Sequence, residues 1–166
     1  MIDLSPINSV SGILAAIGVI VGVVFAVLQL RDLVKTRQTD LVIRLYSNWS
    51  DDKFIEAYTK VNRIDEFEDY NDYVKKYGSP LSGTPANRKW LMIGMYFEGI
   101  GVLLRRELID IGLVDDLLSG PIKNTWKKIK PVAEGVRKEL NQPTVMEYFE
   151  YLANEMQKRE QTLQST

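Results

Sequence analysis

The sequence predicts an all-α protein in which one N-terminal transmembrane helix continues into a cytoplasmic helical bundle of about five to six helices. Three observations predict this fold. Residues 4–30 carry no charged side chain. Apolar residues in the remainder recur at spacings of three and four, which is the period of a helix, and they do not alternate as in a strand. Clusters of Gly, Pro and Ser separate these periodic segments.

Residues 10–30 are long and apolar enough to form the transmembrane helix. Only Ser11 and Gln29 are polar among them, and a helix of about 20 apolar residues crosses a bilayer core. A cleaved signal peptide is the alternative, but the segment lacks a basic region before it and a small-residue cleavage site after it. We therefore expect residues 1–9 to lie outside the cell membrane as an extracytoplasmic N-terminus.

Basic residues set the expected orientation of a single-pass membrane protein. Arg31, Lys35, Arg37 and Arg44 follow the apolar segment, and no Lys or Arg precedes it. Because cytoplasmic flanks are enriched in Lys and Arg, the N-terminus should face outward and the C-terminal domain should be cytoplasmic. No Gly or Pro occurs between Val23 and Tyr77, so residues 31–49 are predicted as a juxtamembrane helical stalk, with the helix continuing to about Tyr46.

Residues 50–160 are predicted as the cytoplasmic helical domain. Ser50 is the expected N-cap of its first helix, whose apolar face contains Phe54, Ile55, Tyr58, Val61 and Ile64. A short acidic helix is predicted over residues 66–77, closed by Gly78. Residues 79–87 contain two Pro, one Gly and several hydroxyl residues, which indicates the longest loop.

The segment 88–106 is predicted as the central helix of the domain. Residues 90–104 are apolar nearly all round, with Glu98 as the only charge. A second membrane span is the alternative, but the stretch is short for a bilayer and carries an acid at its middle, so we expect a buried helix. Glycines are unfavourable in a helix interior, so Gly94, Gly99 and Gly101 suggest close contact with a neighbouring helix.

Three further helices are predicted. Residues 111–118 form a short helix that ends at Ser119–Gly120, and Pro121 starts the next. An apolar seam on that helix contains Ile122, Trp126, Ile129, Ala133, Val136 and Leu140, with a bend expected at Pro131. The last helix covers about 144–159, with Val145, Phe149, Leu152 and Met156 on one face and Thr144 and Glu147 as a capping box. Residues 161–166 are predicted as a frayed tail.

Composition excludes several classes of function. The chain has no Cys and no His, which removes disulfides, thiolate or imidazole metal ligands, Cys nucleophiles and His bases. A net charge of -1 gives no support for a nucleic-acid binder. We therefore predict no catalytic residue, cofactor or metal. The enzyme class that remains open would act on lipid or nucleotide through carboxylates and lysines.

Three features are candidate sites. The first is a stripe of small residues on the membrane helix that allows close packing with another helix, formed by Ser11, Ala15, Gly18, Gly22 and Ala26 and continued by Gln29. The second is a basic set that would suit anionic lipid or an acidic partner, although a solvated or intramolecular face is the simpler interpretation, formed by Lys123, Lys127, Lys130 and Arg137. The third is Glu98, a candidate buried acid for which Arg105, Arg106 or Arg137 are possible partners.

The sequence also resembles a known family over its second half. The resemblance rests on Tyr96-Phe97-Glu98-Gly99-Ile100-Gly101-Val102-Leu103-Leu104-Arg105-Arg106, on Leu108-Ile109-Asp110, on Asp116-Leu117-Leu118, and on Trp126 and Arg137. These residues look like those of a prokaryotic family of short, mostly membrane-anchored helical proteins that is described only as a domain of unknown function. The match lies mainly within residues 88–152, with a weaker similarity over 40–58. It implies a fold and no activity.

These observations favour an accessory or adaptor protein. Its transmembrane helix would pack laterally, and its cytoplasmic domain would dock on a protein partner, for which a larger integral membrane complex is the expected candidate. A homo-oligomeric scaffold or pore-like assembly, in which the stripe contacts copies of this chain, is the alternative. Crosslinking in membranes separates the two.

Overall fold

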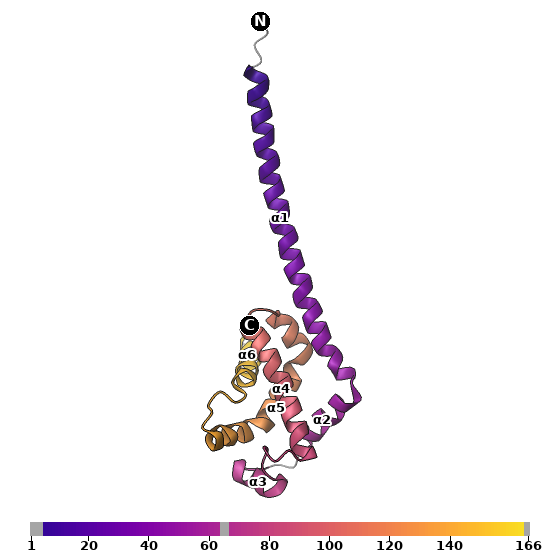
Figure 1. Cartoon of the computed structure of the whole chain (residues 1–166), viewed down its shortest axis with the longest axis vertical. Coiled ribbons are helices and arrows are strands. Elements are labelled where there is room, and N and C mark those ends of the chain that lie inside the picture. The colour runs from indigo at the N-terminus through magenta and orange to yellow at the C-terminus, as the bar shows by residue number, and fades with distance from the viewer. Residues whose placement is uncertain (1–4, 64–66, 165–166) are drawn as a thin grey trace. The chain divides into compact units, whose positions relative to one another are not determined.

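The computed structural model describes residues 5–63 and 67–164. Within these ranges every regular element is helical, which confirms the all-α prediction (Figure 1). The elements are α1 (Ser5–Ser47), a 3-10 helix η1 (Asn48–Ser50), α2 (Asp52–Asn62), α3 (Tyr70–Tyr77), α4 (Pro85–Arg105), α5 (Ile111–Leu140) and α6 (Glu147–Gln164). Predictions for residues 1–4, Ile64, Glu66 and residues 165–166 lie outside the described residues.

The chain divides into two units, Met1–Asp40 and Leu41–Thr166. In the first unit α1 runs without interruption, as the absence of Gly and Pro after Val23 predicts. Among the described residues α1 is the only helix that is long and apolar enough to cross a membrane, over Leu14–Ser47, and none of its most apolar stretch is buried. Large side chains such as Leu14 and Phe25 are more than 60% exposed.

The second unit is built around α4, which packs chiefly on α6 (Figure 1). Three aromatic residues from three helices meet at its centre. The Phe97 ring of α4 stacks on Phe149 of α6 at 4.9 Å, and Trp126 of α5 meets the same Phe149 ring edge-on at 5.0 Å. Phe97 and Phe149 are fully buried, so α4 is a core helix of this unit, as predicted.

The last turns of α1 belong to the second unit. Val42 is fully buried in its core, and Leu45 and Trp49 pack against that core. The Tyr96 hydroxyl donates a hydrogen bond of 2.7 Å to the carbonyl oxygen of Leu45. The unit therefore begins at Leu41, within the segment predicted as a stalk.

Two short helices begin later than predicted because acidic side chains cap them. The N-cap of α2 is Asp51 in place of the predicted residue 50, and the Asp51 carboxylate accepts a hydrogen bond of 2.9 Å from the Phe54 N–H. Ile55 is 43% exposed and does not join the core. Asp69 caps α3 in the same way through the Asp72 N–H. Gly78 ends α3 with a φ of 80°, a conformation that suits glycine.

Close packing of α3 on α5 depends on a glycine, Gly135 of α5. Any Cβ atom at Gly135 would overlap the ring of Tyr70, the first residue of α3. The Tyr70 hydroxyl donates a hydrogen bond to the Glu139 carboxylate one helical turn further along α5. Burial first, and then Glu139, raises the pKa of Tyr70 to about 12. The lack of a side chain at Gly135 therefore provides the space that the Tyr70 ring of α3 occupies.

The predicted break at Ser119–Gly120 is wrong, because α5 is one helix from Ile111 to Leu140. Both Pro121 and Pro131 lie inside it. Each proline removes one N–H from the helix, but Leu118 and Ile122 on either side of Pro121 are buried and hold the chain in register. In Figure 1 the two ends of α5 run in different directions, in keeping with internal prolines. The seam residues are buried except Leu140, which is 41% exposed.

The capping box predicted for the last helix is also absent. α6 begins at Glu147, and Thr144 lies in a turn before it, where its carbonyl oxygen accepts from the Glu147 N–H at 3.2 Å. Met146 has a φ of 56°, which turns the chain into the helix. Phe149, Leu152 and Met156 are buried as their spacing predicts.

Candidate functional site

The stripe of small residues lies open along α1. Ala15, Gly18, Gly22, Ala26 and Gln29 are all exposed. A Cβ atom added at Gly18 or Gly22 would meet nothing within 4 Å. The side chain of Ser11 lies outside the described residues. The geometry therefore leaves a face free for another helix to approach.

Two lysines of the predicted basic set are paired with acidic side chains of the same chain. Lys123 pairs with Glu160 of α6 at 2.7 Å, and Lys130 lies 3.9 Å from Glu134. Lys127 instead lines a cavity, as does its neighbour Lys128. The intramolecular interpretation therefore holds for Lys123 and Lys130.

Arg137, the fourth member of that set, holds the connection between α5 and α6. Its Nη1 atom lies 2.8 Å from Oε2 of Glu150. Its Nε and Nη2 atoms donate hydrogen bonds to the carbonyl oxygens of Val145 and Met146, at 2.8 and 3.3 Å. Three interactions from one guanidinium fix the start of α6, so Arg137 has a structural role.

Glu98 has a different partner from those predicted. Its Oε2 atom accepts a hydrogen bond of 2.6 Å from the backbone N–H of Phe149, in the first turn of α6. Burial raises the pKa of Glu98, while the N–H groups of Phe149 and Tyr148 and the charge of Arg137 partly oppose this shift. Arg105 lies over the ring of Tyr151 at 5.5 Å. This half-buried acid thus caps a helix.

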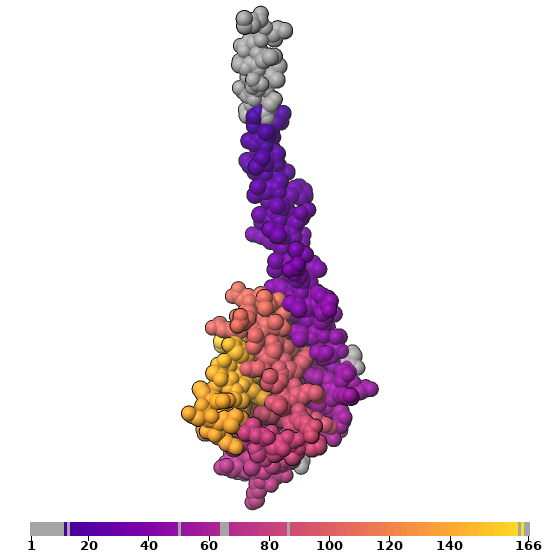
Figure 2. All heavy atoms as spheres, viewed as in Figure 1, coloured from indigo at the N-terminus to yellow at the C-terminus, as the bar shows by residue number. Residues whose placement is uncertain are grey.

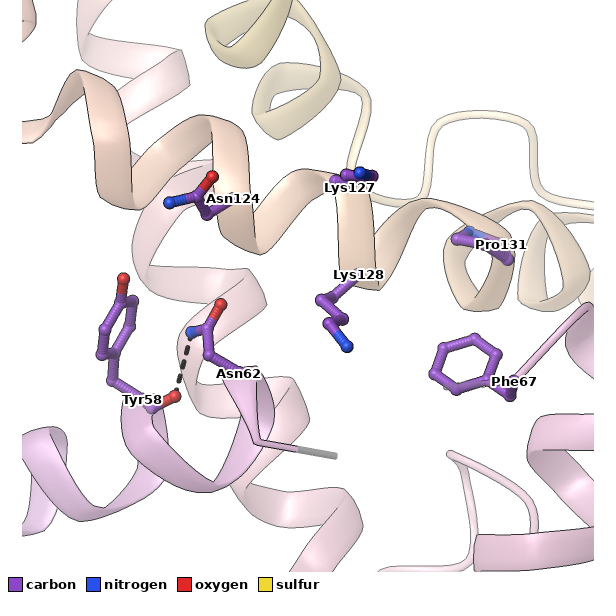
Figure 3. Close-up of a pocket in the computed structure, with 7 residues that line it drawn as sticks. All are labelled: Tyr58, Asn62, Phe67, Asn124, Lys127, Lys128 and Pro131. Carbon is purple, nitrogen blue, oxygen red and sulfur yellow. Dashed lines mark hydrogen bonds between the residues drawn. The ribbon is translucent and has the colours of Figure 1, made fainter. Parts of the chain in front are cut away.

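A cavity of about 510 Å³ lies between α2, α5 and Phe67 (Figure 3). Its lining combines two lysines, two amides, two aromatic rings and a proline, namely Tyr58, Asn62, Phe67, Asn124, Lys127, Lys128 and Pro131. Figure 3 shows the Lys128 side chain pointing into the space between Asn62 and Phe67.

A hydrogen-bonded cluster fixes one wall of this cavity. The Asn62 amide nitrogen donates to the carbonyl oxygen of Tyr58 at 2.9 Å and to Oγ1 of Thr125 at 3.3 Å. Thr125 is fully buried, and its hydroxyl oxygen lies 3.4 Å from Oδ1 of Asn62. Burial raises the pKa of Tyr58, and a hydrogen bond with Thr125 partly opposes the shift. The Asn62 amide group is therefore satisfied within the protein.

One face of α4 is exposed and apolar in the second unit. Leu91, Met92 and Met95 are 49, 40 and 57% exposed. Gly99 continues this face one turn further, with open space where a Cβ would lie. Exposed Arg88 and Arg106 stand at its two ends. We call this surface the α4 face; α4 lies at the surface of the molecule in the view of Figure 2.

Sequence reasoning missed both the cavity and the α4 face. Tyr58 and Phe67 are far from Lys127 in the sequence, and no spacing rule brings them together. The apolar residues on all sides of the segment 90–104 predicted a fully buried helix. The same pattern is also compatible with a helix that has one exposed apolar face. Among the described residues no group of acidic side chains could hold a metal ion.

The family model described as "Domain of unknown function (DUF4760)" matches residues 16–156. The match includes most of the apolar part of α1 as well as the second unit, and so exceeds the predicted range of 88–152. No curated protein and no solved structure matches the chain. The chain belongs to this family of unknown function.

Proposed function

We propose that this family member is a single-pass membrane-anchored adaptor whose second unit binds a partner protein in a larger membrane complex. The observation that carries the proposal is the exposure of α1. From Leu14 to Leu30 its large apolar side chains are 44–67% exposed. A continuous apolar surface of this length is unfavourable in water and matches the hydrocarbon core of a bilayer.

The orientation proposed is N-terminus outside and second unit in the cytoplasm. It rests on the four basic residues that follow the apolar segment, Arg31, Lys35, Arg37 and Arg44, all of which are exposed. In lipid, helices associate mainly through close packing. The open surface at Gly18 and Gly22 supports lateral association of α1 with another membrane helix.

The α4 face is the docking surface that we propose on the second unit. Its apolar centre is formed by Leu91, Met92 and Met95, and methionine side chains adapt readily to a partner. Because Arg88 and Arg106 flank it, the complementary partner is an apolar helix with acidic residues at its ends. Arg88 also donates a hydrogen bond of 2.9 Å to the Gly83 carbonyl oxygen, which anchors its side chain at this end.

Cysteine labelling tests the anchor and its orientation. The natural chain has no Cys, so Asn8→Cys and Gln157→Cys each provide a single thiol. In intact cells a membrane-impermeant maleimide should label the Asn8→Cys variant alone, and Gln157→Cys should react only after permeabilisation. Labelling of Gln157→Cys in intact cells, or release of the protein by an alkaline wash, would contradict the proposal.

Site-specific photocrosslinking tests the docking surface. A photoreactive amino acid at position 95 should give an adduct with a membrane protein, and the crosslinked segment should be an apolar helix with acidic ends. The same group at Leu81, which is 50% exposed in a loop, is the control and should give no such adduct. Adducts that contain only copies of this chain would favour the homo-oligomeric alternative.

A further inference from the structure

Methionine is the only sulfur-containing residue of this chain, and its side chains divide into two groups. The sequence has five methionines and no cysteine, and the structure describes all of them except Met1. Met92 and Met95 are 40 and 57% exposed. Met146 and Met156 are 5 and 0% exposed. The described methionines are therefore an exposed pair on α4 and a buried pair in the core.

The exposed pair lies within the α4 face. Residues three or four apart on a helix are neighbours on its surface, so Met92, Met95 and Leu91 form one exposed apolar patch. On a buried side of the same helix, Met146 lies so close to Gly94 that a Cβ atom at this glycine would overlap its side chain. One side of α4 thus presents methionine to solvent, and another side packs against methionine in the core.

Exposure decides which of these sulfur atoms a peroxide can reach. The sulfur lone pair attacks one oxygen of hydrogen peroxide, the O–O bond breaks, and a proton moves from the transferred oxygen to the departing hydroxide, which gives a sulfoxide and water. The sulfur is oxidised by two electrons and the peroxide is reduced. In the folded protein Met92 and Met95 are open to this reaction, whereas Met146 and Met156 become accessible only when the core opens.

Oxidation of the exposed pair changes the α4 face without altering the core. A sulfoxide is polar and accepts hydrogen bonds, and the apolar surface of a partner helix offers no donor to it. Because Met92 and Met95 are exposed, their sulfoxides stay hydrated in the free protein. The cost of removing this water arises only on docking, so the face loses affinity for its partner while the fold persists.

We propose that Met92 and Met95 form a methionine oxidation site at which peroxide releases the docking partner of the α4 face. The release rests on the proposed function, since it requires an apolar partner on this surface. The order in which the methionines are oxidised does not. Methionine sulfoxide reductases convert sulfoxides back to methionine, with one enzyme for each epimer, so the release is reversible.

Peptide mass spectrometry of the full chain in detergent micelles tests the order of oxidation. Under limiting hydrogen peroxide, Met92 and Met95 should be oxidised at least about ten-fold faster than Met146 and Met156. Urea unfolding of the oxidised protein should show that the second unit is still folded. Similar rates for all four side chains, or unfolding of the unit as the exposed pair is oxidised, would overturn the proposal.

Photocrosslinking in native membranes tests the release. A photoreactive amino acid at position 91 should give an adduct whose yield falls at least about five-fold after peroxide treatment and recovers after treatment with both reductases. The double variant Met92→Leu, Met95→Leu keeps the surface apolar and has no sulfur there, so its adduct should survive peroxide. Met146→Leu is the matched control, since it retains the exposed pair and should respond like the natural chain.

The outcomes of the crosslinking experiment separate this proposal from the docking proposal. An equal loss of adduct in the natural chain and in the double variant would assign the effect to oxidation of the partner and overturn the release. An adduct of the natural chain that peroxide leaves unchanged would overturn it as well. Absence of any adduct before treatment would contradict the docking surface itself and the release with it, while the order of oxidation would still be decided by mass spectrometry.

Discussion

The carboxylate of Glu98 on α4 lies 2.6 Å from the backbone nitrogen of Phe149 on α6. The first N–H groups of a helix have no partner within it, and α6 obtains one from a different helix. The acid that the sequence marks as anomalous in an apolar segment is therefore what ties the start of α6 to the centre of the unit.

Removing this cap should destabilise the second unit. Glu98→Ala leaves the Phe149 N–H without its acceptor, and the loss of an N-cap costs about 0.5–2 kcal/mol. Urea unfolding in mild detergent, followed by circular dichroism, measures the change. Asp116→Ala, at an exposed position of α5, is the control and should change stability by less than about 0.5 kcal/mol. Equal losses in the two variants would contradict the capping role.

The pKa of Glu98 predicts a pH dependence with a definite sign. Burial raises this pKa in the folded protein above its ordinary value of 4.5, so the folded state holds the proton more tightly than the unfolded state. The contribution of Glu98 is fully present below pH 4.5 and is lost as the pH rises toward the folded pKa. Glu98→Gln should therefore match the natural chain at low pH and become relatively more stable as the pH rises through this window. A difference that stays constant between pH 4 and 7 would refute the prediction.

Two glycines on α4 should respond to alanine in opposite ways. A Cβ atom at Gly101 would overlap the backbone of Tyr148, whereas one at Gly99 would meet nothing within 4 Å. Gly101→Ala should cost about 1–3 kcal/mol or more through overpacking, and Gly99→Ala should stabilise the helix by up to about 1 kcal/mol. The same urea titration compares them. A similar sign for both would show that α4 and α6 do not approach as described.

Trp126 should be one of the most costly residues to truncate. It is 7% exposed and contacts the Phe149 ring at 5.0 Å. Trp126→Ala should destabilise the second unit by about 3–5 kcal/mol, because it leaves a large cavity. Tyr46→Ala, at a position 45% exposed, should be nearly neutral by the same measurement. A small effect of Trp126→Ala would place this side chain outside the core.

Substitutions in the stripe of small residues on α1 should change association in the membrane and leave the second unit folded. Replacing Gly18 and Gly22 together by Leu fills the open surface and should reduce lateral association. Crosslinking yield in native membranes measures this, while circular dichroism should find the second unit still folded. Val19→Leu with Val23→Leu, two substitutions at neighbouring positions, is the matched control. Unchanged crosslinking in the glycine variant would argue against packing through the stripe.

Local pattern predicted most of the fold. The apolar spacing on α5 and α6 identified Trp126, Phe149 and Met156 as core residues, and each is buried. The errors occurred where a distant residue overrides a local rule. Pro121 and Ser119–Gly120 look like a helix break, but the buried neighbours Leu118 and Ile122 keep α5 continuous.

The candidate site was less predictable for the same reason. The lysines at 127 and 128 were visible as a charged segment, yet their surroundings come from α2 and from Phe67, more than fifty residues earlier. The sequence marks Glu98 as unusual, but its partner is a backbone N–H. Nearly every residue has such a group, so residue types do not indicate which one Glu98 binds. Contacts made by main-chain atoms are therefore the part that residue types cannot reveal.

The close fit of α3 over Gly135 also fixes one side of the cavity that contains Phe67. Phe67 packs edge-on against Tyr73 of α3 at 5.0 Å, and α3 is seated by the fit of Tyr70 over Gly135. The position of Phe67 thus depends on how α3 is placed, while the rest of the cavity wall is formed by α2 and α5. A substitution that displaces Tyr70 from Gly135 would therefore reach the cavity through Phe67 and leave the aromatic packing around Phe97 in place.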